Sequence, residues 1–135
     1  MASRYLLDTN TASYIIKGNN PLVDRRLAKV PMAQLAISAV TEGELRFGAA
    51  RLPQAKRLHN LIEAFLLRVV ALPWDSDAAR CYGELHATQE GQGRPMGNLD
   101  LMIGAHALAL GAILVTNNHA FKWIKGLKVE DWTKR

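Results

Sequence analysis

The sequence predicts an α/β protein, a three-layer α/β/α sandwich built on a mostly parallel central sheet. Three observations predict this class. Short, continuously apolar runs alternate with longer segments of helical periodicity, which is typical of a parallel sheet covered by helices on both faces. Several of these runs stop abruptly at polar side chains. The length of 135 residues and the hydrophobic share of 49% fit one domain, residues 1–135, with a substantial core.

The first half of the chain contains three predicted strands, each an apolar run, and four predicted helices with apolar residues at helical spacing. In order, they are a strand at residues 4–7, helices at 9–16 and from Pro21 through Val30, a strand at 35–37, helices at 38–50 and 54–68, and a strand at 69–72. The first strand should be buried on both faces because its run is continuously apolar. Gly48 and Pro53 mark the weakening and the end of the third helix.

The second half of the chain predicts two helices, two strands and one loop. In order, they are a helix capped by Asp75 or Ser76 and running through His86, a loop at 91–95, a helix at 99–110 closed by Gly111, and strands at 112–115 and near 127–129. The helix at 99–110 is rich in alanine and leucine, which indicates that it is buried.

The charge balance favours a polyanionic partner. Seventeen basic and twelve acidic residues give a formal net charge of +5 and a pI near 9.7. Between Leu45 and Trp74 five basic residues accompany the single acid Glu63, and five more lie between Lys122 and Arg135. The candidate site residues, in contrast, are acidic. A solvated surface on a basic protein is the alternative interpretation.

The chain is expected to be soluble and cytoplasmic, with no membrane contact. No window approaches the roughly 18 to 20 uninterrupted apolar residues that a membrane span needs, and residues 1–4 run directly into a strand instead of a signal peptide. Cys81 is the only cysteine, which excludes an internal disulfide and a thiolate metal cluster and fits a reducing compartment.

Three acids near polar stops form the candidate site. Asp8 follows the first strand, Glu44 lies in the helix after the second strand, and Asp100 lies at the start of a later helix. Thr116 and Asn118 follow the fourth strand and can add oxygen atoms. Because the carboxyl ends of parallel strands share one edge of a sheet, these side chains should meet there. A site made of carboxylates, with no nearby cysteine and no His-x-x-x-His pair, favours Mg²⁺ or Mn²⁺ over zinc as the bound metal.

Each acid also has a structural interpretation. Asp8 can cap the helix that follows it. Glu44 matches a capping box, in which it folds back onto the Thr41 amide. Asp100 lies in the first turn of its helix, where the macrodipole stabilises a carboxylate. Glu42 is the rival of Glu44, and since the two project about 200° apart on a helix, only one of them can face the site.

The remaining candidates favour structural roles. His106 lies on an apolar helix, so a core histidine is a better interpretation than a metal ligand. Trp74, Trp123 and Trp132 can stack on bases, but at loop and terminal positions tryptophans more often pack the chain against the core. Neither group therefore enters the candidate site.

Together these motifs resemble the PIN-domain ribonuclease toxins of the VapC type. The resemblance covers essentially the whole chain, and it rests on the ordered set because each motif alone is common. The motifs are Leu6-Leu7-Asp8-Thr9-Asn10, Ile37-Ser38 leading through Thr41 to Glu44-Leu45 with Gly48-Ala49, the run from Gly97 to Ala107 around Asp100, Val115-Thr116-Asn117-Asn118, and the run from Gly126 to Trp132.

The resemblance implies an endoribonuclease toxin that depends on Mg²⁺ or Mn²⁺ and cleaves structured RNA of the tRNA or rRNA class. It implies a homodimer that a VapB-type antitoxin inhibits, with operator DNA bound only through that antitoxin. Asp8, Asp100 and Glu44 would bind the metal, and Thr116 and Asn118 would support the site at the fourth position. Many relatives have an aspartate at this position, so the amides at residues 117 and 118 imply a one-metal resting site.

Two other functions stay open. A catalytically inactive PIN-like module would bind RNA or a partner without cleaving anything, and metal-dependent cleavage distinguishes it from the nuclease. A phosphatase or phosphoryl-transfer domain would use Asp8 as its nucleophile. That chemistry needs a second carboxylate close by, which Asn10 does not supply. A dinucleotide-binding fold is disfavoured as well, because no glycine-rich loop follows the first strand.

Overall fold

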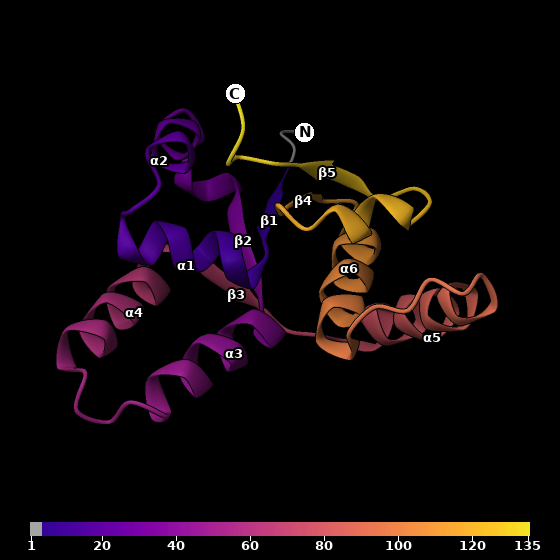
Figure 1. Ribbon diagram of the computed structural model, residues 1–135, viewed down its shortest axis with the longest axis horizontal. Coiled ribbons are helices and arrows are strands. Elements are labelled where there is room, and N and C mark those ends of the chain that lie inside the picture. The colour runs from indigo at the N-terminus through magenta and orange to yellow at the C-terminus, as the bar shows by residue number, and fades with distance from the viewer. Residues whose placement is uncertain (1–3) are drawn as a thin grey trace.

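The computed structural model of the protein describes residues 4–135, in which five strands, six α-helices and two short 3₁₀ helices follow one another (Figure 1). The strands are β1 (Tyr5–Leu7), β2 (Leu35–Ser38), β3 (Val70–Leu72), β4 (Ile113–Val115) and β5 (Lys128–Glu130). The helices are α1 (Thr9–Lys17), α2 (Pro21–Ala28), α3 (Ala39–Ala50), α4 (Lys56–Arg68), α5 (Ser76–Gly91) and α6 (Asn98–Leu110), with the 3₁₀ helices η1 (Met32–Gln34) and η2 (His119–Trp123).

The five strands of the described chain form one sheet, entirely parallel, in the order β3-β2-β1-β4-β5. In Figure 1 the helices α1, α2 and α4 lie on one side of this sheet and α5 and α6 on the other. The predicted α/β/α sandwich is therefore confirmed. The strand order reverses at β1, since β2 and β3 continue on one side of it and β4 and β5 on the other. Open parallel sheets bind ligands beyond the carboxyl ends of their strands at such a reversal.

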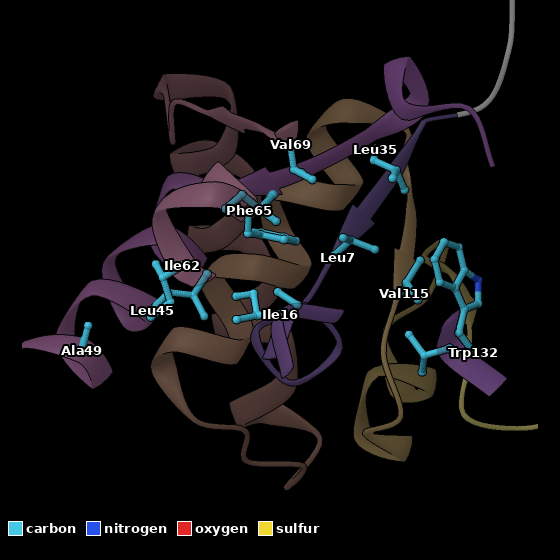
Figure 2. Close-up of a cluster of buried hydrophobic side chains, with 13 residues drawn as sticks. Leu7, Ile16, Leu35, Leu45, Ala49, Ile62, Phe65, Val69, Val115 and Trp132 are labelled. Carbon is cyan, nitrogen blue, oxygen red and sulfur yellow. The ribbon is translucent and has the colours of Figure 1, made fainter. Parts of the chain in front are cut away.

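Neighbouring residues of the central strands enter two different buried clusters. Leu6 and Leu114 pack in the cluster under α5 and α6, whereas Leu7 and Val115 pack in the cluster under the first four helices. Figure 2 shows the second of these clusters, which also contains the fully buried Trp132. Both faces of the sheet are covered, which is why the strands read as continuous apolar runs. Trp132 packs against the core, as its position near the end of the sequence predicts.

Most predicted boundaries agree with the structure within two residues, and the larger differences have local causes. The helix predicted to run through His86 continues as α5 to Gly91, because the residues between them contain no helix breaker. Among the smaller differences, the strand predicted from residue 69 starts one residue later, at Val70, since Val69 still caps α4. The two 3₁₀ helices were not predicted. Both are single short turns without apolar periodicity, the signal on which the other helices were predicted.

Three sequence predictions concern the signal peptide, the membrane span and the single cysteine. The absence of a signal peptide was inferred from residues 1–4, of which residues 1–3 lie outside the described residues. From residue 4 to residue 135, no helix combines the length and the apolar character that a membrane span requires. Cys81 on α5 is a half-buried free thiol.

Candidate active site

Asp8 lies at the carboxyl end of β1, beside the point where the strand order reverses. Its backbone N–H donates to the Val115 carbonyl oxygen at 3.0 Å, which fixes it against β4. Its Oδ1 atom accepts a hydrogen bond from the Thr11 backbone N–H at 2.8 Å, so Asp8 does cap α1. The side chain is nevertheless only 5% exposed. A cap on an ordinary surface helix needs no such burial.

The environment of Asp8 favours its neutral form. Burial raises the pKa of this carboxyl above its usual range, and hydrogen bonds from Thr116 and Thr11 oppose that rise without cancelling it. The negative charge of Asp131 adds to the rise. Asp131 directly follows β5, so it comes from the same edge of the sheet. Sequence reasoning missed it as a site residue, although its position just after a strand is the signal that identified Asp8.

The Glu44 side chain is hydrogen-bonded to the first residue of α1. The Thr9 hydroxyl donates to the Glu44 Oε1 atom at 2.5 Å and lies 3.3 Å from the Thr41 hydroxyl. The capping-box interpretation of Glu44 is wrong, because α3 starts at Ala39 and its cap is Ser38, whose hydroxyl accepts from the Val40 N–H at 3.1 Å. Glu44 therefore lies too far along α3 to reach an unpaired amide at its start.

The rival acid Glu42 faces a different part of the structure. Its Oε2 atom pairs with Arg46 Nε at 2.9 Å, and the same guanidinium reaches Glu63 Oε1 on α4 at 2.9 Å. These pairs lie at the surface. Arg46 thus belongs to an ion-pair cluster between α3 and α4, and of the two glutamates Glu44 is the one that faces Asp8 and Asp100.

Asp100 lies in the first turn of α6 and is half-buried. Burial raises the pKa of its carboxyl most, followed by the negative charges of Glu44 and then Asp8. The field of these two acids at Asp100 means that α1, α3 and α6 bring three carboxylates into one acidic cluster. Asp100 also lies at the start of α6, as the macrodipole interpretation requires, and the helix dipole there partly offsets the repulsion between the acids.

Thr116 and Asn118 lie at the carboxyl end of β4 and shape the turn behind the acids. The Thr116 N–H donates to the Glu130 carbonyl oxygen at 2.9 Å, and its hydroxyl accepts from the Asn118 N–H at 3.0 Å. Asn118 Oδ1 accepts from the Ala120 N–H at 3.0 Å, so its side chain caps η2. Thr116 also lowers the pKa of the Asp8 carboxyl, while the Asn118 side chain acts only on the turn.

His106 connects the two helices that carry Asp100 and Glu44. It is a buried core histidine, as predicted, and its Nδ1 lies 2.8 Å from the hydroxyl of Ser38, the cap of α3. Burial lowers the pKa of His106, and the charge of Asp75 opposes this only in part. A neutral imidazole therefore links the middle of α6 to the start of α3, the two helices that carry Asp100 and Glu44.

The donor set fits a hard divalent cation. Its ligands would be carboxylate oxygens that repel one another and become more stable when a cation lies between them. Among residues 4–135, however, no three His, Cys, Asp or Glu side chains lie close enough together to hold an ion in their present positions. A hydrated Mg²⁺, which keeps several water ligands and is held through one or two carboxylates, fits this arrangement better than a fully dehydrated ion.

Two grooves flank Glu44. The first, of about 280 Å³, lies between α1, α3 and α4 and is lined by the basic residues Lys17 and Arg51. The second, of about 660 Å³, lies between α3 and α6 and is lined mainly by apolar side chains, among them the exposed Phe47 and Leu99. Both grooves contain Glu44 and Arg51, and the first adds Lys17, so basic side chains lie beside the acidic cluster.

Comparison with known proteins gives consistent matches over nearly the whole chain. A family model described as the PIN domain matches residues 5–127. The tRNA(fMet)-specific endonuclease VapC of Shigella flexneri is 38% identical over 131 residues, which are 96% of this chain and 98% of that protein. Ribonuclease VapC1 of Haemophilus influenzae is 36% identical over 132 residues, with 96% and 98% covered. The crystal structure of DNA-bound VapBC from Salmonella typhimurium matches with a TM-score of 0.89 at 33% identity, covering 97% of this chain and 99% of that one.

Proposed function

The chain belongs to the PIN domain family, among its VapC ribonucleases, and on this premise we propose that it is an endoribonuclease toxin that cleaves structured RNA with the help of a divalent cation. The motif-based resemblance to this family is thereby confirmed. The related protein from Shigella flexneri is named a tRNA(fMet)-specific endonuclease, so tRNA is the first substrate class to test.

The acidic cluster at the reversal of the sheet supports this proposal most directly. Asp8 comes from the end of β1, Glu44 from α3 and Asp100 from α6, and the charges of the first two help to raise the pKa of the third. Such repulsion costs stability unless a cation is bound, which is typical of a functional site. We propose Mg²⁺, or alternatively Mn²⁺, as the cation that these three acids hold. It would supply a Lewis acid that activates water and stabilises charge on the phosphate.

The protein's own residues bind and orient the RNA. Lys17 and Arg51 line the groove that begins at Thr9 and Glu44, where they can hold phosphates next to the cluster. The Thr11 backbone N–H positions the Asp8 carboxylate, Thr116 lowers the pKa of that carboxyl, and Asn118 holds the turn that carries Thr116. Without an acid at residues 117 and 118, the proposed site holds one metal at rest.

The proposed partners follow from the family. Solved relatives include VapBC2 from Rickettsia felis bound to a DNA fragment from their promoter and VapBC-5 from Mycobacterium tuberculosis, described as a member of the VapBC family of toxin-antitoxin systems. We propose a VapB-type antitoxin that inhibits this chain and through which alone it contacts operator DNA. A homodimer and a cytoplasmic location complete the proposal, the latter supported by an RNA substrate and a free thiol. Residues 1–135 would act as one domain.

Cleavage of total cellular RNA tests this function. Purified, antitoxin-free protein is incubated with RNA in Mg²⁺ or Mn²⁺ and, in parallel, in EDTA. Asp100→Ala is the test variant, and Asp77→Ala, an exposed acid on α5, is the matched control. Discrete metal-dependent fragments should form with wild type and Asp77→Ala and be absent with Asp100→Ala. Intact RNA with folded wild-type protein would instead support the inactive, RNA-binding or partner-binding module.

A further inference from the structure

A second hollow lies away from the acidic cluster, on the side of the molecule formed by α5 and η2. We call it the α5 pocket. It has a volume of about 420 Å³, and the side chains that matter for its chemistry are Cys81, Gln89, Arg94, Trp123 and Lys125. None of these residues belongs to the proposed catalytic site or to the grooves beside Glu44.

Gln89 is the unusual residue of the α5 pocket. Its side chain is 2% exposed, and its Nε2 atom has no hydrogen-bond partner among residues 4–135. A buried amide without a partner costs stability, and native proteins keep few of them without a reason. Because the Gln89 side chain lines the pocket, a ligand there can supply the missing acceptor.

The other lining residues suit a nucleotide. The Arg94 guanidinium lies over the Trp123 ring, 5.8 Å from its centroid, and the indole is 46% exposed. A guanidinium and an indole are the two kinds of flat surface on which unpaired RNA bases stack. Arg94 and Lys125 contribute two positive charges against the single acid Glu84, and this balance favours a phosphate.

We propose that the α5 pocket binds one unpaired nucleotide of the RNA substrate, at a distance from the cleaved bond. In this assignment the base stacks on Trp123, the Gln89 amide hydrogen-bonds to the edge of the base, and Arg94 and Lys125 hold its phosphate. The inference rests on the proposed function, since it assigns part of the recognition of the same RNA.

The position of Arg94 makes this connection physically reasonable. Arg94 precedes Asp100 by only six residues, so their Cα atoms lie within about 20 Å of each other even if the chain between them is fully extended. A few nucleotides of single-stranded RNA span that distance. The backbone N–H of Arg94 donates to the Gln89 carbonyl oxygen at 3.0 Å, which holds the loop before α6 against the end of α5.

Binding of a short single-stranded RNA in EDTA tests the inference without any dependence on cleavage. Trp123→Leu should weaken binding about tenfold, the order of magnitude of one lost base stack. Gln89→Met, which is similar in shape, should weaken binding while leaving thermal stability equal or higher, because it removes the unpaired amide. Arg94→Gln should also weaken binding, and Arg57→Gln, an exposed arginine on α4 with the same charge change, should have a smaller effect.

Cys81 supplies a second readout because it is the only cysteine and lines the pocket. RNA should slow its reaction with a maleimide in wild type and not in Trp123→Leu. Unchanged affinity in all three pocket variants with unprotected Cys81, or protection by an antitoxin and not by RNA, would overturn the inference. If RNA binds the pocket as described but wild type cleaves nothing in Mg²⁺ or Mn²⁺, the nuclease proposal fails alone.

Discussion

Thr9 donates a hydrogen bond of 2.5 Å to Glu44, and this contact joins the first residue of α1 to the middle of α3. It fixes a carboxylate that would otherwise rotate freely on a helix surface. The bond also orients Glu44 toward the helix that Asp8 caps. The geometry of the acidic cluster therefore depends on a hydroxyl group that is not itself an acid.

Replacing Thr9 with valine should lower RNA cleavage while leaving the fold intact. The change keeps the shape and removes the donor, so Glu44 loses its orientation, and kcat should fall about tenfold. The free energy of unfolding should fall by only about 0.5 to 1.5 kcal/mol, the usual net value of one hydrogen bond. Thr9→Ser keeps the hydroxyl and should retain most activity. Equal kcat for wild type and Thr9→Val would show that Glu44 needs no such orientation.

Two substitutions of Asp8 should separate its structural role from its chemical one. Asparagine is as good a helix cap as aspartate, whereas alanine loses the cap, which costs about 0.5 to 2 kcal/mol. Asparagine also removes a charge that burial destabilises, so at neutral pH Asp8→Asn should unfold at a urea concentration equal to or higher than that of wild type. Asp8→Ala should unfold at a lower urea concentration than Asp8→Asn. Both should lose metal-dependent cleavage. Retained cleavage in Asp8→Asn would mean that Asp8 is only a cap.

Replacing Asp100 with asparagine should make the metal-free protein more stable at neutral pH. Burial and the neighbouring acids raise the pKa of Asp100 in the folded state above its unfolded value of 3.8. Between the unfolded and the folded pKa the folded state binds more protons than the unfolded state, so stability falls as the pH rises through this range. At pH 7 the variant lacks this repulsion and its Tm should be about 2 to 4 °C higher. Below pH 3.8 the difference should vanish.

Metal titration gives the complementary result for Asp100. Mg²⁺ should raise the Tm of wild type, because an ion that binds only the folded state stabilises it, and should have little effect on Asp100→Asn. Differential scanning calorimetry with and without EDTA measures both effects. Lower stability of the variant at pH 7 would show that Asp100 is held by favourable contacts and is not a repelled ligand.

His106 should make the protein less stable as the pH falls below about 6.5. Burial lowers the pKa of His106 in the folded state. Just below pH 6.5 the unfolded state therefore binds a proton while the folded state stays neutral, and the free energy of unfolding decreases. The slope should approach 1.4 kcal/mol per pH unit. Urea unfolding between pH 7 and 5.5 measures it. The slope should be reduced in His106→Gln and preserved in the control His59→Gln.

Much of the fold could be predicted from the sequence because local signals and tertiary packing agree. The apolar runs are continuous since both faces of the sheet are covered, and the alternation of strands with helices follows from that. Asp8 could be placed at the sheet edge because a strand ends directly before it. His106 and Trp132 could be assigned to the core from their apolar surroundings and their position.

Other features depend on contacts between segments that lie far apart in the sequence. Glu44 could be separated from Glu42 only once Thr9 and Arg46 were seen to hold them. Asp131 joins the neighbourhood of Asp8 only because β5 pairs beside β4. In the sequence Gln89 resembles an ordinary polar helix residue, and its burial without a partner arises only in the folded structure, where α5 packs chiefly against α6.

The reversal of the strand order also dictates when the site can exist during synthesis. The Thr11 hydroxyl donates to the Val115 carbonyl oxygen across a separation of 104 residues, and Asp8 and Thr116 meet across a similar one. During synthesis Asp8 is made well before β4, which carries the groups that hold it. A nascent chain that ends before β4 therefore lacks part of the proposed catalytic site, so cleavage cannot begin until β4 has been made and has paired with β1.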